Sequence, residues 1–293
     1  MQSEQVNINP YDDEWEDIKI SDALVQTYSL EEWSGGFSLM TAGYRDQLNP
    51  ADANDPKVAF NLLTASILAE AKARVFERKL KVGEIAHVHV GGETRPHTQE
   101  FIAVLSRVYA AHNMKVHLRA RVRTTPIWYS SFGVFYQQYQ SGDNLTASHS
   151  QFFKGGWKPI DSEGKQLLAE EEEIIAEVQK IVKSQATIRL APWMSSGNIM
   201  HDFDVDEAYV GYLKSVLGEP LVAEIKRAAR ERFRCAASPL GGSMKATTER
   251  LFELLDISTG EKGVIQYFLG EEDSHYHGVG QIEGHNHGTD PGK

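Results

Sequence analysis

The chain has 293 residues, 41% of them hydrophobic, which is enough for two domains with real cores. Its 30 Lys plus Arg against 41 Asp plus Glu give a net charge of −11, which disfavours nonspecific binding to nucleic acid or anionic membranes. No apolar run approaches the roughly 20 residues of a membrane span, and the acidic N-terminus is unlike a signal peptide. The lone cysteine, Cys235, excludes an internal disulfide and is expected in the core. We therefore predict a globular cytoplasmic protein, without nucleic-acid or membrane partners, that holds any anionic ligand in a local basic site.

The first half of the chain alternates between strand-like and helical patterns. Residues 1–35 are polar and acidic, and we treat them as an N-terminal extension with Trp15, Ile18 and Ile20 as anchors. Beyond them, the spacing of apolar residues indicates strands and helices in turn. The expected helices cover 56–79, the region around 101–109, and 126–139, and the expected strands cover 86–90, 115–119 and 143–147. This order is typical of a sheet covered by helices on both faces, in which ligands bind at the carboxyl ends of the strands.

A second α/β domain is expected to follow. The charged segment 166–184 predicts a helix, with four glutamates at 170–173 facing solvent. Polar residues near position 200 indicate a linker, so we place a first domain at 36–200 and a second at 201–293. The expected elements of the second domain are helices at 205–231, a strand at 232–238, a glycine turn at 241–242, a helix ending near 256, and a strand at 263–269.

The segment NLTASHSQFFKGGWKPI, residues 144–160, places a small serine directly after a predicted strand. Ser148 would lie exposed at the carboxyl end of that strand, as a hydroxyl that carries a phosphoryl group must. Gly155 and Gly156 would let the backbone double back, so that the Lys158 ammonium returns near the serine oxygen. Such a lysine could stabilise transferring phosphoryl oxygens or, with a lowered pKa, move a proton. The pattern alone leaves open an ordinary loop without catalytic function.

Several motifs resemble those of one enzyme family. TASHSQFFKGGWK at 146–158 resembles the phosphoserine loop of the alpha-D-phosphohexomutases, the phosphoglucomutase and phosphomannomutase family. MTAGYRD at 40–46 is similar to the family's Gly-Thr-x-Gly-x-Arg segment, GGETRPHTQEF at 91–101 to Gly-x-Asp-x-Arg, and TTP at 124–126 to the Thr-Pro that opens the next helix. YVGYLKSVL and ASPLGGSM resemble the second domain more loosely. The resemblance covers about residues 36–270 and is strongest in the first domain.

This resemblance implies a mixed sheet sandwiched by helices, followed by a second, incomplete α/β domain. It implies that Ser148 gives its phosphoryl group to one hydroxyl of a hexose phosphate and recovers another from a hexose bisphosphate, with hexose 1,6-bisphosphate as activator. His149 would shape the loop or assist proton movement, and Lys158 would be a general acid or base. Thr146 and Lys158 would contact the phosphate, and Arg45 would bind it or orient the serine loop.

Structural interpretations remain open for some of these residues. Arg45 and Arg95 could each form an ion pair with an acidic neighbour, and His97 is expected to be a helix N-terminal or packing residue. The chain also departs from the family pattern at five positions. Ser150 and Gln151 replace the usual Asn-Pro, Gly155 replaces Asn, Met40 replaces Gly, and Glu93 replaces Asp.

The family's magnesium loop, Asp-x-Asp-x-Asp-Arg, is expected shortly after the strand near 263–270, and the chain reaches Lys293 without it. Mg²⁺ would then meet only Ser148, through its phosphate. Asp202, Asp204 and Asp206 alternate like a carboxylate cage, but they precede the second-domain helices, so helix capping is the better interpretation. We expect the truncated front half of a larger enzyme, weak or inactive alone, with the remainder supplied by a complementary polypeptide or by self-association.

Three functions therefore remain open. The leading one is a phosphoglucomutase-like phosphohexomutase, an isomerase of carbohydrate metabolism. The others are a non-catalytic truncated paralogue that binds a phosphosugar or a partner, and a hexose-bisphosphate synthase that uses another phosphoryl donor. The segment SHYHGVGQIEGHNH contains two His-x-His pairs, which are His275, His277, His285 and His287. Such pairs can bind a transition metal. The alternative is a loop that packs on the missing half of the enzyme and has no fixed structure without it.

Overall fold

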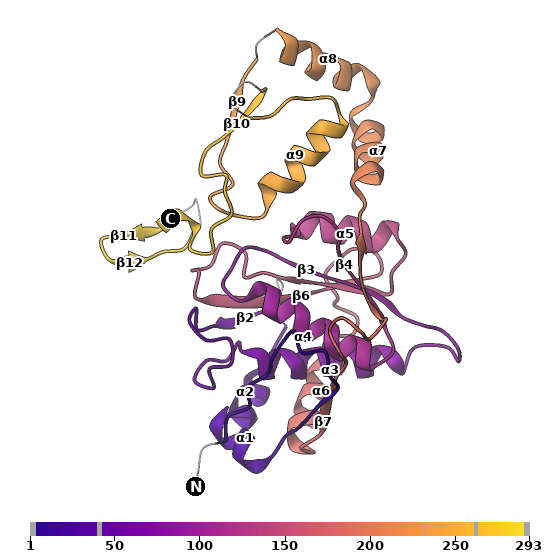
Figure 1. The fold of residues 1–293 in the computed structure, drawn as a ribbon, viewed down its shortest axis with the longest axis vertical. Helices are drawn as coiled ribbons and strands as arrows, with labels where there is room; N and C mark the ends of the chain where they lie inside the picture. The colour runs from indigo at the N-terminus through magenta and orange to yellow at the C-terminus, as the bar shows by residue number, and fades with distance from the viewer. Residues whose placement is uncertain (1–3, 40–42, 232, 261–262, 290–293) are drawn as a thin grey trace.

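The computed structural model describes residues 4–39, 43–231, 233–260 and 263–289, and its centre is a mixed six-stranded sheet (Figure 1). In spatial order the strands are β2 (Tyr44–Gln47), β6 (Lys154–Asp161), β5 (Ser141–Leu145), β3 (His87–Gly92), β4 (Lys115–Arg119) and β8 (Ile199–Phe203). The strands from β5 to β8 in this order run parallel to one another, whereas β6 pairs antiparallel with both of its neighbours.

Helices cover both faces of this sheet, as the sequence predicts (Figure 1). The three helices on one face are α3 (Leu62–Glu77), α4 (Thr98–Ala111) and α6 (Glu171–Lys183). On the other face lies α5 (Ile127–Tyr136), packed over β3, β5 and β6. Neighbouring residues of β5 reach both layers, because Asp143 accepts a hydrogen bond from Tyr109 of α4 while Asn144 donates one to Ser130 of α5.

Residues of the N-terminal extension share the hydrophobic core of the first domain. A small antiparallel sheet joins β1 (Glu16–Lys19) to β7 (Thr187–Leu190), next to α1 (Asp22–Thr27) and α2 (Leu30–Gly36). Ile18 and Ile20 are buried as expected, but Trp15 is 55% exposed and its ring lies under the guanidinium of Arg189.

Local side-chain chemistry explains where two predicted elements begin. The helix expected from 56 starts only at Leu62, because the Asn61 side chain accepts the Thr64 N–H while the Thr64 hydroxyl accepts the Asn61 N–H. The supposed linker near 200 contains a strand, β8, which pairs with β4 up to Phe203. The buried Phe203 ring stacks on His89 at a centroid distance of 3.6 Å, which fixes this strand on the sheet.

The second half of the chain forms a smaller helical and strand assembly above α5 (Figure 1). Two helices occupy the region 205–231, as expected; they meet at Gly218, and Pro220 lies in the first turn of the second one. Cys235 is exposed, so the prediction that it lies in the core is wrong; Arg232, the expected start of its strand, lies outside the described residues. The elements are α7 (Asp206–Leu217), α8 (Glu219–Arg230), β9 (Cys235–Ala237), α9 (Met244–Leu254), β10 (Ile265–Tyr267), a 3₁₀ turn (Tyr276–Gly278), β11 (Gln281–Ile282) and β12 (His285–Asn286).

None of the helices in the described part of the chain is both long and apolar enough to cross a membrane.

Asp204, the middle carboxylate of the alternating aspartates, accepts the backbone N–H of Asp206 at the start of α7. Asp202 instead pairs with the imidazole of His117 at 2.9 Å.

A buried ion pair ties the helix layer to the strand that leads to Ser148. The Lys72 ammonium of α3 lies 2.7 Å from Asp143 of β5, and the two side chains are 2% and 0% exposed. Asp143 also accepts hydrogen bonds from the Tyr109 hydroxyl at 2.6 Å and the Trp157 indole at 2.8 Å. Burial lowers the pKa of Lys72, and the Asp143 carboxylate opposes that shift. The charge of Asp143 is therefore compensated only while these donors stay in place.

Replacing Lys72 with Met should destabilise the protein by roughly 3–5 kcal/mol, because it leaves the Asp143 carboxylate buried without its cation. Urea unfolding followed by circular dichroism measures this loss. Lys165→Met is the matched control, since Lys165 forms an ion pair with Glu163 in which both side chains are largely exposed; it should change stability little. Equal effects of the two substitutions would contradict the assigned role of the buried pair.

Candidate active site

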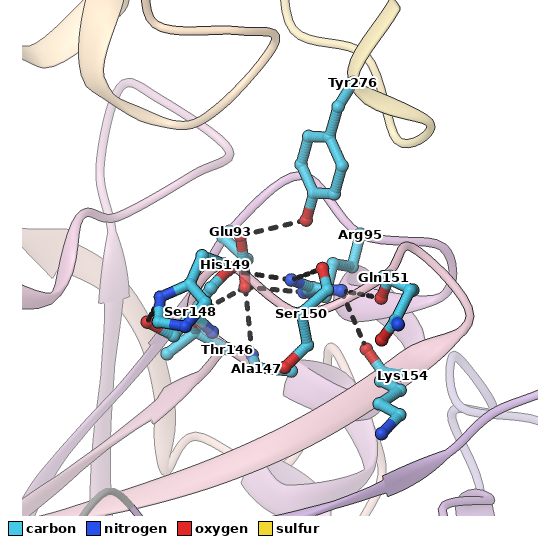
Figure 2. Close-up of polar contacts among 10 residues, drawn as sticks. All are labelled: Glu93, Arg95, Thr146, Ala147, Ser148, His149, Ser150, Gln151, Lys154 and Tyr276. Atoms are coloured by element: carbon cyan, nitrogen blue, oxygen red, sulfur yellow. Dashed lines mark hydrogen bonds and ion pairs between the residues drawn. The ribbon is translucent and has the colours of Figure 1, made fainter. Parts of the chain in front are cut away.

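The turn that carries Ser148 is anchored by one buried arginine (Figure 2). Arg95, 4% exposed, lies between β3 and α4. Its terminal nitrogens donate to the backbone carbonyls of Ser148 at 2.8 Å, Ser150 at 2.9 Å and Lys154 at 3.0 Å, and also to that of Gln151. The guanidinium thus satisfies four carbonyls of a turn that has few backbone partners of its own.

Glu93 joins this arginine to the start of the turn (Figure 2). Its Oε1 accepts from Arg95 Nε at 2.8 Å, from the Ala147 N–H at 3.0 Å, and from the Thr146 hydroxyl. Thr146 Oγ1 in turn accepts the Ser148 N–H at 3.0 Å. Thr146 therefore orients the serine backbone, while its predicted contact with a phosphate stays a prediction.

Ser148 itself is held in a left-handed conformation, with φ of 59°, which is unusual for a residue other than glycine. Its side chain is only partly buried, and Oγ lies 3.4 Å from Nδ1 of the exposed His149. The anchors on both sides of Ser148 keep this conformation in place. The hydroxyl is thus presented near solvent at the carboxyl edge of the sheet.

Three cationic side chains lie on one face of the adjoining strands. Gly156 pairs with Arg45 across β2 and β6, so Arg45, Lys154 and Lys158 share the face of Gly156. The glycines expected in a turn lie in β6, so the interpretation that they double the chain back is wrong. A Cβ on Gly156 would lie 2.3 Å from the Thr146 carbonyl oxygen, so glycine permits the close approach of this strand to the serine turn.

The electrostatics of these cations suit an anionic ligand. Burial lowers the pKa of Lys158, the nearby Arg45 lowers it further, and Glu93 opposes both effects. Burial also lowers the pKa of Arg45, with Arg95 acting in the same direction and Glu93 against it. Within the part of the chain that the structure describes, the buried Nε of Arg45 has no hydrogen-bond partner, so it is available to donate to a bound anion.

The histidine-containing C-terminal segment packs against the serine turn. The Tyr276 hydroxyl points toward Glu93 and donates to it at 3.3 Å, and the Tyr276 ring faces Arg95 at 5.2 Å (Figure 2). Gln151 donates to the Asn286 carbonyl at 3.2 Å, and the His149 carbonyl accepts the Thr289 N–H at 3.2 Å. Among the described residues, no group of three or more His, Cys, Asp or Glu could hold a metal ion.

The structure places the sequence-predicted residues in one region, although residues 40–42 of the arginine motif lie outside the described part. Thr146, Ser148 and His149 form the turn, while Arg45 and Lys158 lie on the strands beside it. His97 occupies the N-terminal position of α4, as expected.

Two features were missed. Arg95 forms the ion pair considered for it but also anchors the serine turn, and Glu93 links that turn to β3. The Gly-x-Glu-x-Arg spacing was the sequence signal that could have identified Glu93 and Arg95. No sequence signal indicated the contact from Tyr276.

The fold and the site together define an α/β domain that presents a serine beside cationic side chains. Comparisons with known proteins show which family this domain belongs to. Residues 39–185 match the model described as phosphoglucomutase/phosphomannomutase, alpha/beta/alpha domain I. The chain therefore belongs to the phosphoglucomutase/phosphomannomutase family. A phosphoglucomutase of Staphylococcus epidermidis is 30% identical over 163 residues, which cover 52% of this chain and 28% of that protein.

Solved structures show the same fold. A putative phosphomannomutase from Thermus thermophilus matches 82% of this chain and 47% of its own, with a TM-score of 0.63 and 23% identity. Parafusin from Paramecium, a phosphoglucomutase, matches 90% of this chain and 46% of its own, with a TM-score of 0.62 and 14% identity. The chain thus spans about half the length of these structures and 28% of the curated relative.

Arg95→Lys should loosen the serine turn, because an ammonium cannot donate to four separated carbonyls as the planar guanidinium does. Losing even one charge-assisted hydrogen bond should lower the free energy of local opening by about 1.5 kcal/mol or more. Amide exchange at 147–154 should therefore accelerate roughly tenfold. Hydrogen–deuterium exchange with mass spectrometry measures this. In the control Arg78→Lys, which changes a half-exposed arginine paired with Glu177, the turn should exchange normally. An unchanged turn in Arg95→Lys would refute the anchoring role.

Proposed function

We propose that this chain provides the phosphoserine-carrying part of a cytoplasmic phosphohexomutase of the phosphoglucomutase kind. Ser148 Oγ would receive a phosphoryl group from a hexose 1,6-bisphosphate and pass it to a hydroxyl of a hexose phosphate. The observation that carries this proposal is the partly exposed Ser148, held in a left-handed turn by Arg95 and Glu93 beside the cations Arg45 and Lys158.

In the forward transfer, a sugar hydroxyl oxygen forms a bond to phosphorus as the bond from phosphorus to Ser148 Oγ breaks. The hydroxyl proton needs an acceptor, and the lowered pKa of Lys158 increases the fraction of neutral amine that can take it. Arg45 would neutralise the transferring oxygens with its unpartnered donor. His149, 3.4 Å from Oγ, would orient the hydroxyl or assist the proton.

Mg²⁺ is the cation expected for such a transfer, where it neutralises phosphoryl charge. The described residues do not fit it, since they contain no group of three or more metal-ligating side chains. We therefore assign no step to a metal here. Full turnover would require carboxylate ligands and sugar-selecting residues from further sequence, in the same or another polypeptide.

The experiment is incubation with glucose 1,6-bisphosphate, alone and with the remainder of a phosphohexomutase, followed by intact mass and phosphopeptide mapping. We expect one phosphoryl group on Ser148. Ser148→Ala should abolish the label, whereas Ser150→Ala should keep it, because Ser150 offers Arg95 only its backbone carbonyl. Absence of label on Ser148 in the presence of the complementary part would overturn the proposal.

The same mixture separates the two rival functions. Ser150 and Gln151, which depart from the family loop, motivate a phosphosugar- or partner-binding module; such a module would bind hexose phosphate without turnover. A hexose-bisphosphate synthase would accumulate the bisphosphate from another phosphoryl donor through the same serine. Interconversion of hexose phosphates supports the mutase.

A further inference from the structure

A cavity lies at the carboxyl edge of the sheet, and no residue of the Ser148 turn lines it. The chain leaves β3 for α4 on one face and leaves β4 for α5 on the other. Connections that diverge in this way open a crevice beyond the strand ends, where open α/β sheets bind ligands. A cavity of about 260 Å³ lies at this point, lined by Gly91 of β3, Leu118 of β4 and Ile102 of α4 among others.

This cavity is basic in a protein with a net charge of −11. Arg119, Arg121, Arg123 and His201 line it, and none of the described residues that line it is Asp or Glu. Carboxylates do approach the arginines from outside. Asp206 lies 3.3 Å from Arg119, but it also accepts the hydroxyl proton of Tyr129, so its charge is shared.

Arg119 shows the clearest sign of a missing ligand. Its side chain is only 5% exposed, and its guanidinium stacks 3.6 Å from the centre of the Tyr129 ring. Within the described residues, its buried Nη1 has no hydrogen-bond partner, and neither has the buried Oγ1 of Thr125, which also lines the cavity. Buried donors on a cation are costly to leave unpaired, so an acceptor oxygen at the floor of this cavity would stabilise both groups.

Aromatic side chains form the rim. Trp193 lies edge-on to Tyr11 at 5.8 Å and to His201 at 6.0 Å, and all three line the cavity. Such walls suit a flat or apolar organic group attached to the anion. The cavity volume restricts this group to a small one.

We propose that this crevice is a second anion-binding site, which takes a small phosphate monoester with its phosphate on Arg119 and Thr125 and its organic part against Trp193. It goes beyond the proposed mutase function and does not depend on it. Arg121 and Arg123 are exposed at the entrance; Arg123 adds positive charge there, and Arg121, whose Nε pairs with Asp204 at 3.4 Å, adds less. None of the residues that line the cavity belongs to the turn around Ser148.

Isothermal titration calorimetry with inorganic phosphate, phenyl phosphate and benzoate tests this site. The titrations use the Arg45→Gln, Lys158→Gln double variant, so that these two cations beside Ser148 contribute no binding. Phenyl phosphate should bind more tightly than phosphate or benzoate, and Trp193→Leu should remove its advantage over phosphate. Arg119→Gln and Thr125→Val should each weaken binding roughly tenfold or more.

Because Arg119 is buried and its variant could fail to fold, the exposed Arg121→Gln and Arg123→Gln variants carry the test independently. Each should also weaken phenyl phosphate binding several-fold. Arg189→Gln is the matched control, since it removes an equal charge from an exposed arginine that stacks on a different tryptophan, Trp15. The proposal fails if phenyl phosphate does not bind the double variant, if Arg189→Gln weakens binding equally, or if benzoate binds as tightly as phenyl phosphate.

Discussion

The serine turn depends on one side chain, the guanidinium of Arg95. The carbonyls of a turn lie outside the ladder of hydrogen bonds between strands, and buried carbonyls without partners are costly. Arginine solves this because it offers five donors in a fixed plane, and here four carbonyls between Ser148 and Lys154 accept from it. The Glu93 carboxylate fixes the orientation of that plane.

This anchoring explains how an unfavourable backbone conformation persists at Ser148. A left-handed residue other than glycine costs on the order of 1 kcal/mol or more, and several anchors around it must outweigh that cost. Below the turn, the Lys72–Asp143 pair holds β5 against α3, and the close packing of Gly156 against Thr146 holds β6 against the start of the turn. The partly exposed hydroxyl thus sits on a turn that several hydrogen bonds and a close backbone contact hold in place.

The sequence predicted the elements whose signals are local and missed those that depend on pairing. The strand at 115–119 and the helices around 101–109 and 126–139 have clear periodicity, and the structure confirms them. Gly155 and Gly156 were interpreted as part of a turn, but they are strand residues of β6. Glycine is needed at both positions because Phe60 and Thr146 occupy the space that side chains would need. The same limit applies to the site. Thr146, Ser148 and His149 lie in one short segment and were recognised, whereas Tyr276 contacts Glu93 across 183 residues without any local pattern.

The topology that presents Ser148 also produces the basic crevice, because both lie beyond the carboxyl ends of parallel strands. The segment after β3 serves both places, since Glu93 and Arg95 anchor the serine turn while Gln99, at the start of α4, lines the crevice. The two places nevertheless use different cations. Arg95 is committed to the carbonyls of the turn, and Arg119 is stacked on Tyr129. Substitutions can therefore affect one place without removing the charges of the other, which makes their functions separable by experiment.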